Sequence, residues 1–530
     1  MNGINKNRVT ESPLTQALSL TTTDNSAGRS VTVSDKEIKY SFQDLTSDTL
    51  SLIFRHLKLR DIRSLQKVCT RLRDLIKEDK ALAKAWFRQF SSSHQNQLRM
   101  PLTIKDKNQL RAWFESFSDD QALLQSLTER EPTSVYSPAL LFFTRAELMS
   151  QCKTYELVTR ATIDKTYKAN SSPPIAGPLN RPELNRVNSA ALSADSRYLV
   201  TANGDRTAKI YGLKADGIWE IKTTIPHDKP VVSAIFSPDS HHLLIVSFNA
   251  AKIYDLAWDE SWEPNTTFRH GALINSATFS TDSRHAVITG CDETGKVLSR
   301  KDDGSWRLTA TLRKAYNSAN FSDDGCHVVT TSFNKTVEIH SQKADGSWEE
   351  TDSIPHSGKV ISAKFSPNGC YLVTASMDCR TKLFEKKPDG SWKENTLTLY
   401  NNVNKSATFS PDSRHLVTGS NFGTVNIYGR NANGVWKVKA IFFHDDEVLS
   451  ASFSPDGRHL VSIYKRCKTA KIIGQQDNGS WLEKANIVHD DFITSASFSA
   501  DGSQVITSSK DGIVKITELR RNHLLSAVTE

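Results

Sequence analysis

The chain has 530 residues, of which 38% are hydrophobic and 24% charged, and this length predicts about two to four domains. Basic residues exceed acidic ones by 67 to 59, an excess that suits acidic partners but does not by itself indicate nucleic acid. No apolar run approaches the roughly 20 residues of a membrane helix. The first thirty residues lack the apolar stretch of a signal peptide, so we expect neither a membrane protein nor a conventionally secreted one.

The cysteines give the same indication about compartment. The sequence holds seven, an odd number, and no two form a Cys-x-x-Cys pair. This spacing predicts neither a disulfide framework nor a zinc site. We therefore expect a reducing, cytoplasmic or nuclear environment and no bound metal.

Residues 1–37 are polar, without hydrophobic periodicity, and are predicted to be disordered. The pattern changes over residues 38–90. Leu50, Ile53 and Leu57 recur at helical spacing, and Asp61 is a candidate N-cap for a second apolar segment that includes Val68. These short helices carry more apolar surface than they can bury among themselves, which predicts a partner.

The stretch LTSDTLSLIFRHLKLRDIRSLQKVCTRL, beginning at Leu45, resembles an F-box, and the resemblance extends over residues 42–86. Thr46 replaces the family's proline, and Leu72 stands where tryptophan is common, so both departures affect the adaptor-binding surface more than the fold. The resemblance implies docking on a Skp-type adaptor, and through it on a cullin, by Leu45, Leu50, Ile53, Leu57 and Val68. A small helical hairpin that merely caps the next domain is the alternative.

Residues 91–153 are predicted to be a helical spacer. Within and just before it, helices are expected over 81–90, 108–117 and 138–151. Residues 154–185 combine a strand-like segment with a proline-rich linker, because four prolines fall between residues 171 and 182.

A repeat of about 44 residues occupies residues 186–520. Seven tryptophans recur at spacings of 42 to 45. In step with them, a Ser-Ala-x-Phe-Ser motif, with variations, occurs eight times; its fourth residues are Leu192, Phe236, Phe279, Phe321, Phe365, Phe409, Phe453 and Phe498. Short alternating segments separated by Pro-Asp-Gly and Asp-Gly-Ser turns indicate four strands per unit, which is typical of a β-propeller blade. The predicted fold class is α+β multidomain, with an eight-bladed propeller and seven blades as the alternative.

The repeat also predicts how the propeller is packed and closed. Small Ser-Ala pairs suit the crowded innermost strands, and each tryptophan opens an outermost strand, where we interpret it as packing rather than as a binding ladder. The last unit stops after its third strand. We expect residues 155–163 to supply the missing outer strand, with residues 520–530 as the competing source and 521–530 otherwise a tail.

The units resemble the WD-repeat family. The resemblance lies in the Phe-Ser-Pro-Asp-Gly turn, the aspartates or asparagines between second and third strands, and the histidines before the inner strands: His227, His270, His356, His444 and His489. The family's Trp-Asp dipeptide is missing and is replaced by pairs such as Tyr211-Gly212. The family's buried hydrogen-bond network is therefore incomplete, and we interpret these histidines and aspartates as structural.

An F-box with a WD-repeat propeller resembles the substrate receptors of cullin-type ubiquitin ligases, which act by proximity. Such a receptor performs no chemistry itself, and the sequence contains no Walker loop, nucleophile elbow or dinucleotide-binding turn. We therefore expect no catalytic residues and no cofactor. The alternatives are a scaffold without ubiquitin transfer, a nucleic-acid binder and a propeller enzyme; acidic loops argue against the second, and the third lacks a convergent catalytic set.

For the target we expect a basic arc on the face that carries the loops before each inner strand. Its candidate residues are Arg206, Lys229, Lys314, Lys335, Lys359 and Arg380. They would suit an acidic or phosphorylated target protein. Late blades place acidic residues such as Asp445 and Asp490 in the same loops, and Glu293 interrupts the arc.

The units are unusually alike and resemble bacterial WD-like repeats. An F-box has little use in a bacterium. This combination suggests an effector delivered into the cytoplasm of a eukaryotic host.

Overall fold

The computed structural model describes residues 20–21, 32–33, 81–99, 104, 106–118, 121, 124–125, 137–152, 154–164, 186–395, 399–400, 403–431 and 434–521. The chain divides into two compact units, residues 1–88 and 89–530. In the first unit, β1 (Leu20–Thr21) pairs with β2 (Thr32–Val33), and α4 covers Ala81–Phe87. The predicted F-box helices and their adaptor-binding residues lie outside the described residues.

Three described helices precede the propeller within the second unit: α5 (Ser92–Arg99), α6 (Lys107–Glu115) and α8 (Pro138–Ser150). Asp106 caps α6 by accepting a hydrogen bond from the Gln109 amide. Pro138 is the first residue of α8, where a backbone N–H would have no acceptor within the helix, so proline costs no hydrogen bond there. The predicted helix over 81–90 ends at Phe87. Helix α5 was not predicted, because its serine-rich start carries no apolar periodicity.

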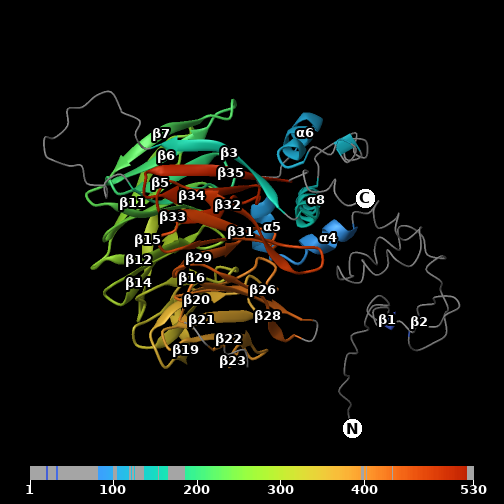
Figure 1. Cartoon of the computed structure of the whole chain (residues 1–530). Coiled ribbons are helices and arrows are strands. Elements are labelled where there is room, and N and C mark those ends of the chain that lie inside the picture. Colours follow the sequence, from blue (N-terminus) through green and yellow to red (C-terminus); the bar gives the residue numbers. More distant parts are fainter. Residues whose placement is uncertain are drawn as a thin grey trace, which may run out of the picture. The chain divides into compact units, whose positions relative to one another are not determined.

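Eight antiparallel sheets form the propeller (Figure 1). Seven have four strands, and the fifth sheet has five because its outer strand is described in two pieces. The innermost strands are β4 (Val187–Leu192), β8 (Val231–Phe236), β12 (Ile274–Phe279), β16 (Ala319–Phe321), β20 (Val360–Phe365), β25 (Asn404–Phe409), β29 (Val448–Phe453) and β33 (Ile493–Phe498). The second strands are β5 (Tyr198–Asn203), β9 (His242–Ser247), β13 (His285–Gly290), β17 (His327–Thr331), β21 (Tyr371–Ser376), β26 (His415–Ser420), β30 (His459–Tyr464) and β34 (Gln504–Ser509).

The third strands are β6 (Thr207–Leu213), β10 (Ala250–Leu256), β14 (Thr294–Arg300), β18 (Thr336–Gln342), β22 (Arg380–Lys386), β27 (Thr424–Arg430), β31 (Thr469–Gln475) and β35 (Ile513–Arg521). The outer strands are β7 (Trp219–Pro226), β11 (Trp262–Arg269), β15 (Trp306–Arg313), β19 (Trp348–Pro355), β23 (Trp392–Glu394) with β24 (Leu399–Tyr400), β28 (Trp436–Phe443), β32 (Trp481–Val488) and β3 (Tyr155–Asp164). We number the blades 1 to 8 from β4 to β33. The prediction of eight blades is confirmed, and the seven-bladed alternative is wrong.

The tryptophans pack between blades, as predicted. Trp481 contacts the ring of His415, which begins the second strand of the preceding blade, at a centroid distance of 5.5 Å. Trp306 contacts His242 in the same way at 5.4 Å. Both indoles are 4% exposed, so they hold neighbouring blades together and are not available to a ligand.

The ring is closed from the N-terminal side, as the sequence indicated. Strand β3 pairs antiparallel with β35, with Tyr155 opposite Arg521 and Asp164 opposite Ile513. The hydrophobic core beneath this sheet joins Tyr155 to residues of α6, α8 and blade 7.

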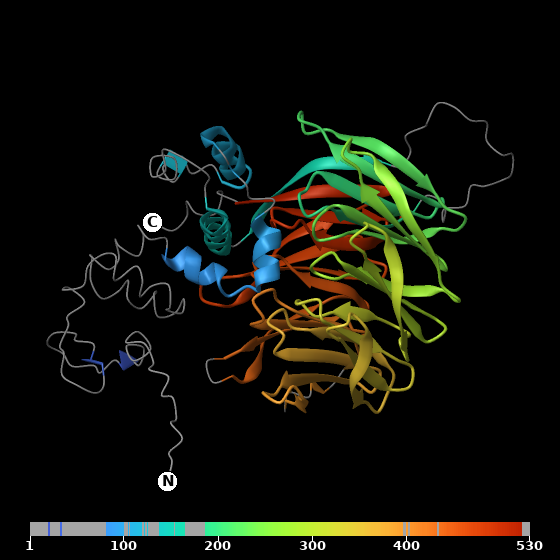
Figure 2. The ribbon, with the colours of Figure 1, turned by 180° about the vertical axis from the view of Figure 1, so that it is seen from behind.

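The helical segment before β3 is fastened to blades 7 and 8, and Figures 1 and 2 both place α5 and α8 beside them. The Arg458 guanidinium donates to the Glu147 carboxylate at 2.7 Å, and Ser150 donates to Asp477 at 2.5 Å. A ring nitrogen of His94 lies 2.9 Å from the Pro455 carbonyl oxygen. The spacer from α5 onward is therefore a continuous part of the propeller unit.

Candidate target-binding surface

Two loops from each blade reach the face on which the basic arc was predicted. The turn between the second and third strands repeatedly contains a residue with positive φ, such as Arg206 (φ 69°) and Lys335 (φ 65°). In blade 1, Asp205 supports this turn by accepting hydrogen bonds from the Thr207 amide and hydroxyl. Such a turn holds the side chain outward, which is why a long cation recurs there without contributing to the core.

The structure separates the predicted arc into two groups. Arg206 and Lys229 are exposed on loops of blade 1, whereas Lys335 and Arg380 are exposed on blades 4 and 5, beside the half-buried Lys359. Between them, blades 2 and 3 present Phe248 and Glu293 at the corresponding turn. The basic surface is therefore interrupted by two blades.

Lys314 belongs to an ion pair within the propeller. Its ammonium lies 3.3 Å from a carboxylate oxygen of Glu338, whose side chain is fully buried, and 3.7 Å from Glu350. The hydrogen bond that the Lys314 ammonium donates to Glu338, together with the negative charge of this carboxylate, raises the pKa of Lys314. This lysine is structural, and it cannot serve the arc without leaving a buried carboxylate unpaired.

The repeat explains why Lys314 is there. It occupies the position that the predicted structural histidines hold after other outer strands, and Glu338 occupies the third position of its strand. In most blades that third position is lysine: Lys209, Lys252, Lys296, Lys382, Lys471 and Lys515. Where a histidine follows the outer strand, the lysine on the next blade lies close enough to lower the histidine's pKa. Between blades 3 and 4, a Lys–Glu pair replaces this His–Lys pair.

The histidines are buried, as the structural interpretation predicted. Burial, with the nearby lysine, lowers the pKa of His227 and His356 to about 4. The same two causes lower the pKa of His444 and His489 to about 4. A ring nitrogen of His489 forms a hydrogen bond with the Thr507 hydroxyl at 2.7 Å. All four rings are neutral at pH 7, so they add no positive charge to the surface.

Lys359 has partners that sequence reasoning missed. Its ammonium lies 3.3 Å from the ring centroid of Phe333 and 5.2 Å from that of Tyr316, and the two rings are 3.7 Å apart. Burial lowers the pKa of Lys359. The three residues come from three separate loops. No spacing in the sequence marks their meeting, although the cation–π geometry fixes the position of the charge.

In the late blades the acidic loops are partly neutralised. Glu447 forms ion pairs with Lys405 and with Lys465, the latter at 3.6 Å. Asp445 accepts a hydrogen bond from the Tyr464 hydroxyl at 3.3 Å. These loops therefore bind one another and leave less negative potential than their composition suggests.

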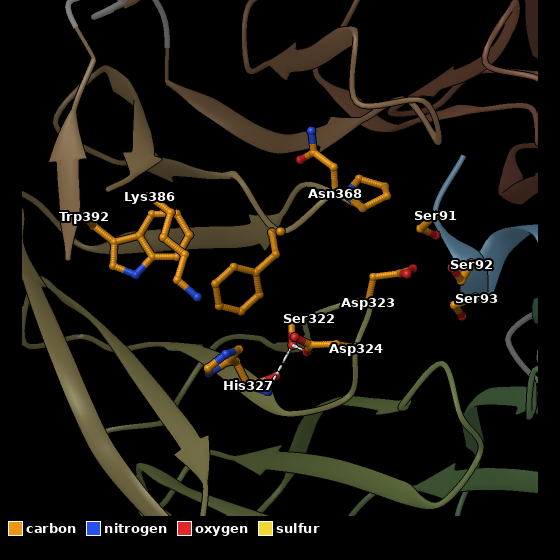
Figure 3. Close-up of a pocket in the computed structure, with 13 residues that line it drawn as sticks. Ser91, Ser92, Ser93, Ser322, Asp323, Asp324, His327, Asn368, Lys386 and Trp392 are labelled. Atoms are coloured by element: carbon orange, nitrogen blue, oxygen red, sulfur yellow. Dashed lines mark hydrogen bonds between the residues drawn. The ribbon is translucent and has the colours of Figure 1, made fainter. Parts of the chain in front are cut away.

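A cavity of about 450 Å³ lies elsewhere, against the turns between first and second strands of blades 4 and 5 (Figure 3). The Ser91–Ser93 segment faces Asp323 and Asp324 across it, with Lys386 and Trp392 on the far side. The cavity contains a serine, a histidine and an aspartate, but not in a catalytic relay.

Ser322 donates its hydroxyl proton to Asp324 and accepts a bond from the His327 backbone amide at 2.9 Å. The His327 ring instead lies 2.7 Å from the Ser341 hydroxyl. The same Ser–Asp turn recurs in other blades, for example at Ser237 and Ser410. These residues therefore build the turn and do not activate a nucleophile.

The described part of the chain lacks two further kinds of feature. No group of three or more histidine, cysteine, aspartate or glutamate side chains there could hold a metal ion. None of its helices is both long and apolar enough to cross a membrane.

Comparison with family models and solved structures places both modules. The F-box domain model matches residues 42–83, and the model of the WD domain, G-beta repeat, matches residues 181–212, 348–385, 436–471 and 484–517. No curated protein sequence matches the chain.

The solved structures are similar in fold alone. Sqt1 of Saccharomyces cerevisiae is 14% identical with a TM-score of 0.53, covering 70% of this chain and 100% of its own. Sqt1 of Chaetomium thermophilum, bound to the N-terminus of a ribosomal protein, is 14% identical with a TM-score of 0.54, covering 63% and 97%. The C-terminal WD40 domain of Sif2 is 13% identical with a TM-score of 0.53, covering 63% and 96%. With an F-box domain ahead of WD repeats that build an eight-bladed propeller, the chain is an F-box/WD-repeat protein.

Proposed function

We propose that this protein is the substrate-recognition subunit of a cullin-type E3 ubiquitin ligase. The F-box docks on a Skp-type adaptor, and the propeller binds a target protein. The observation that carries the proposal is the combination in one chain of the F-box match over residues 42–83 with a closed propeller. The receptor needs no catalytic residue or cofactor of its own, since it acts by raising the local concentration of the target.

The adaptor contact is assigned to Leu45, Leu50, Ile53, Leu57 and Val68, which carry the F-box resemblance. The test is binding of a purified Skp-type adaptor to the full chain by titration calorimetry. A Leu50→Asp/Ile53→Asp variant should lose binding, because two charges enter an apolar contact. A Phe422→Asp variant, exposed on the propeller, is the matched control and should bind normally.

The target contact is assigned to the two basic groups, Arg206 with Lys229, and Lys335 with Lys359 and Arg380. Their loops present cations on one face of the propeller, which suits an acidic or phosphorylated segment and not nucleic acid. The protein would act in the cytoplasm or nucleus, in the host cell if it is delivered by a bacterium.

The second candidate function is a propeller scaffold that assembles proteins without ubiquitin transfer. The departures Thr46 and Leu72 from the F-box pattern favour it. Absence of adaptor binding by both the parent chain and the Leu50→Asp/Ile53→Asp variant, with a folded propeller, would establish this reading instead.

A further inference from the structure

Blade 6 departs from the other blades along its outer strand, β28. At three positions that face the same way, β28 carries Val438, Ile441 and Phe443, which are 52%, 48% and 72% exposed. Strand register identifies the corresponding residues elsewhere. The middle position is polar in the other complete outer strands: Thr162, Thr224, Thr267, Thr311, Ser353 and Asn486. The last position holds Asp164, Pro226, Arg269, Arg313, Pro355 or Val488 in the other complete outer strands. Among the outer strands that the structure describes completely, β28 alone has large apolar side chains at all three positions.

The adjacent loop, between β26 and β27, also has an apolar residue where several other blades have an aspartate. In blades 1, 3, 5 and 8 an aspartate in this loop accepts a hydrogen bond from the backbone amide two residues later. Blade 6 has Phe422 at this position, 70% exposed, and Ser420 takes over the bond to the Thr424 amide. Thr424 is opposite Phe443, and His444 N–H donates to Gly423. Phe422 therefore lies just beyond the end of the same pair of strands.

These side chains face the rim between blades 5 and 6. Trp436 on β28 contacts Tyr371 of blade 5, and Val438 follows on the same face. Ala440 and Phe442 pack instead in a cluster with Trp481 of blade 7. Ile441 and Phe443 alternate with them and so point toward blade 5. We call Phe422, Val438, Ile441 and Phe443 the blade 6 stripe.

The opposite face of β28 is basic. Lys437 and Lys439 are both exposed, and the Lys439 side chain lies over Gly429, the residue opposite Lys437. No other complete outer strand carries two cations at these positions; for example, β7 has Glu220 with Lys222, and β15 has Arg307 with Thr309. β28 is the edge strand of its sheet, and no strand among the described residues pairs with its outer side. It also lacks the edge prolines seen at Pro226, Pro264 and Pro355, which would obstruct an added strand.

We propose that β28 is a docking edge for an extended segment of the target protein in which apolar and acidic residues alternate. The segment adds as a further strand, so that alternate side chains extend the blade 6 stripe while the intervening carboxylates reach Lys437 and Lys439. A second copy of β28 does not fit this edge, since its own lysines would meet Lys437 and Lys439. The inference deepens the proposed function, on which it rests for the partner being a target.

The test uses the full chain and fluorescein-labelled decapeptides, with anisotropy as the readout. One peptide alternates valine or phenylalanine with glutamate, a second replaces every glutamate by lysine, and a third scrambles the first. The first should bind saturably, and the other two at least about tenfold more weakly, since charge and alternation are both required.

An Ile441→Thr/Phe443→Arg variant installs the residues that blade 3 holds as Thr311 and Arg313, so the fold should tolerate it. Binding should fall at least about tenfold, because two apolar contacts are lost. Lys437→Glu/Lys439→Glu should weaken binding similarly from the other face. The matched control is Val488→Arg at the position of blade 7 that corresponds to Phe443, which should bind as the parent does.

The proposal is overturned by equal binding of the three peptides, by unchanged binding in both blade 6 variants, or by no saturable binding at millimolar peptide. It is also overturned if sedimentation velocity detects a dimer that the Ile441→Thr/Phe443→Arg variant abolishes, since a second copy would then cover the stripe. The adaptor is absent throughout. Failure of the docking edge is therefore read separately from failure of adaptor binding.

Discussion

The Tyr155 hydroxyl lies 2.6 Å from Nε2 of His459, a residue 304 positions further along the chain. Their rings are 5.5 Å apart, which is also the separation of His415 and Trp481 one blade earlier. The closing strand thus reproduces the contact between neighbouring blades with a tyrosine in place of tryptophan. The His459 ring also contacts Asp456, at 3.2 Å, so the closure ends in a buried polar chain.

Tyr155→Phe should destabilise the propeller by about 1–3 kcal/mol, because it leaves the buried His459 nitrogen without this partner. Denaturant unfolding followed by circular dichroism measures the change. Tyr198→Phe is the control, since the buried Tyr198 hydroxyl has no hydrogen-bond partner. If both substitutions have the same effect, the Tyr155–His459 bond does not stabilise the closure.

The Lys314–Glu338 pair predicts a compensating double mutant. Lys314→His alone should cost about 3 kcal/mol or more, because the Glu338 carboxylate stays buried with a weaker partner. Lys314→His/Glu338→Lys restores the arrangement of His227 and Lys252 and should recover most of the loss. Thermal melting of the parent, both single variants and the double variant forms a complete cycle. Additive losses in the double variant would contradict the pairing.

Stability should fall as the pH drops from about 6.5 to 4. His227, His356, His444 and His489 have folded pKa values of about 4, below the unfolded value of about 6.5. Between these values the unfolded chain binds more protons, so acid favours unfolding, whereas above pH 6.5 the contribution is fully present. Urea midpoints at pH 7.5, 5.5 and 4.5 measure this, and His227→Leu should flatten the dependence. A midpoint that does not change between pH 7.5 and 4.5 would contradict the assignment.

Charge-reversal variants measure separately how much each of the two basic groups contributes to target binding. Lys335→Glu/Arg380→Glu should weaken capture of an identified target strongly, and Arg206→Glu/Lys229→Glu should do so to the extent that blade 1 takes part. Binding at increasing salt is the measurement, because an electrostatic contact weakens with ionic strength. Lys314→Glu is excluded from this series because it would disturb the core. Target binding that neither double reversal changes would remove both groups from the site.

The propeller could be predicted from the sequence because its determinants are local and recur from blade to blade. Tryptophan spacing, Ser-Ala pairs and Pro-Asp-Gly turns each recur where a strand or turn demands them. The contacts of Lys314 and Lys359 could not be predicted, since both depend on which loops neighbouring blades bring together. In the sequence, Lys314 looks like an ordinary surface lysine. Its partner Glu338 lies 24 residues further along the chain and on another blade, so nothing near Lys314 in the sequence marks the ion pair.

The adaptor contact remains a prediction from the F-box motif alone.

Helix α5 was not predicted for a different reason. Its sequence is rich in serine and glutamine and shows no apolar residues at helical spacing. Contacts with the propeller, such as that of His94 with Pro455, stabilise the helix instead. A pattern that depends on tertiary contact leaves little trace in a single sequence.

The order of the closing strands also has a consequence for synthesis. Strand β3 leaves the ribosome long before β35, its only partner among the described strands. At roughly 5–20 residues per second, the interval lasts about 20 to 70 s. Until β35 is synthesised, the nascent chain carries an open strand edge at β3, so demand for chaperones should be highest during this interval. A chain truncated within the last blade would lack β35, so the propeller could not close. We expect such a product to be degraded, because its strand β3 would stay unpaired.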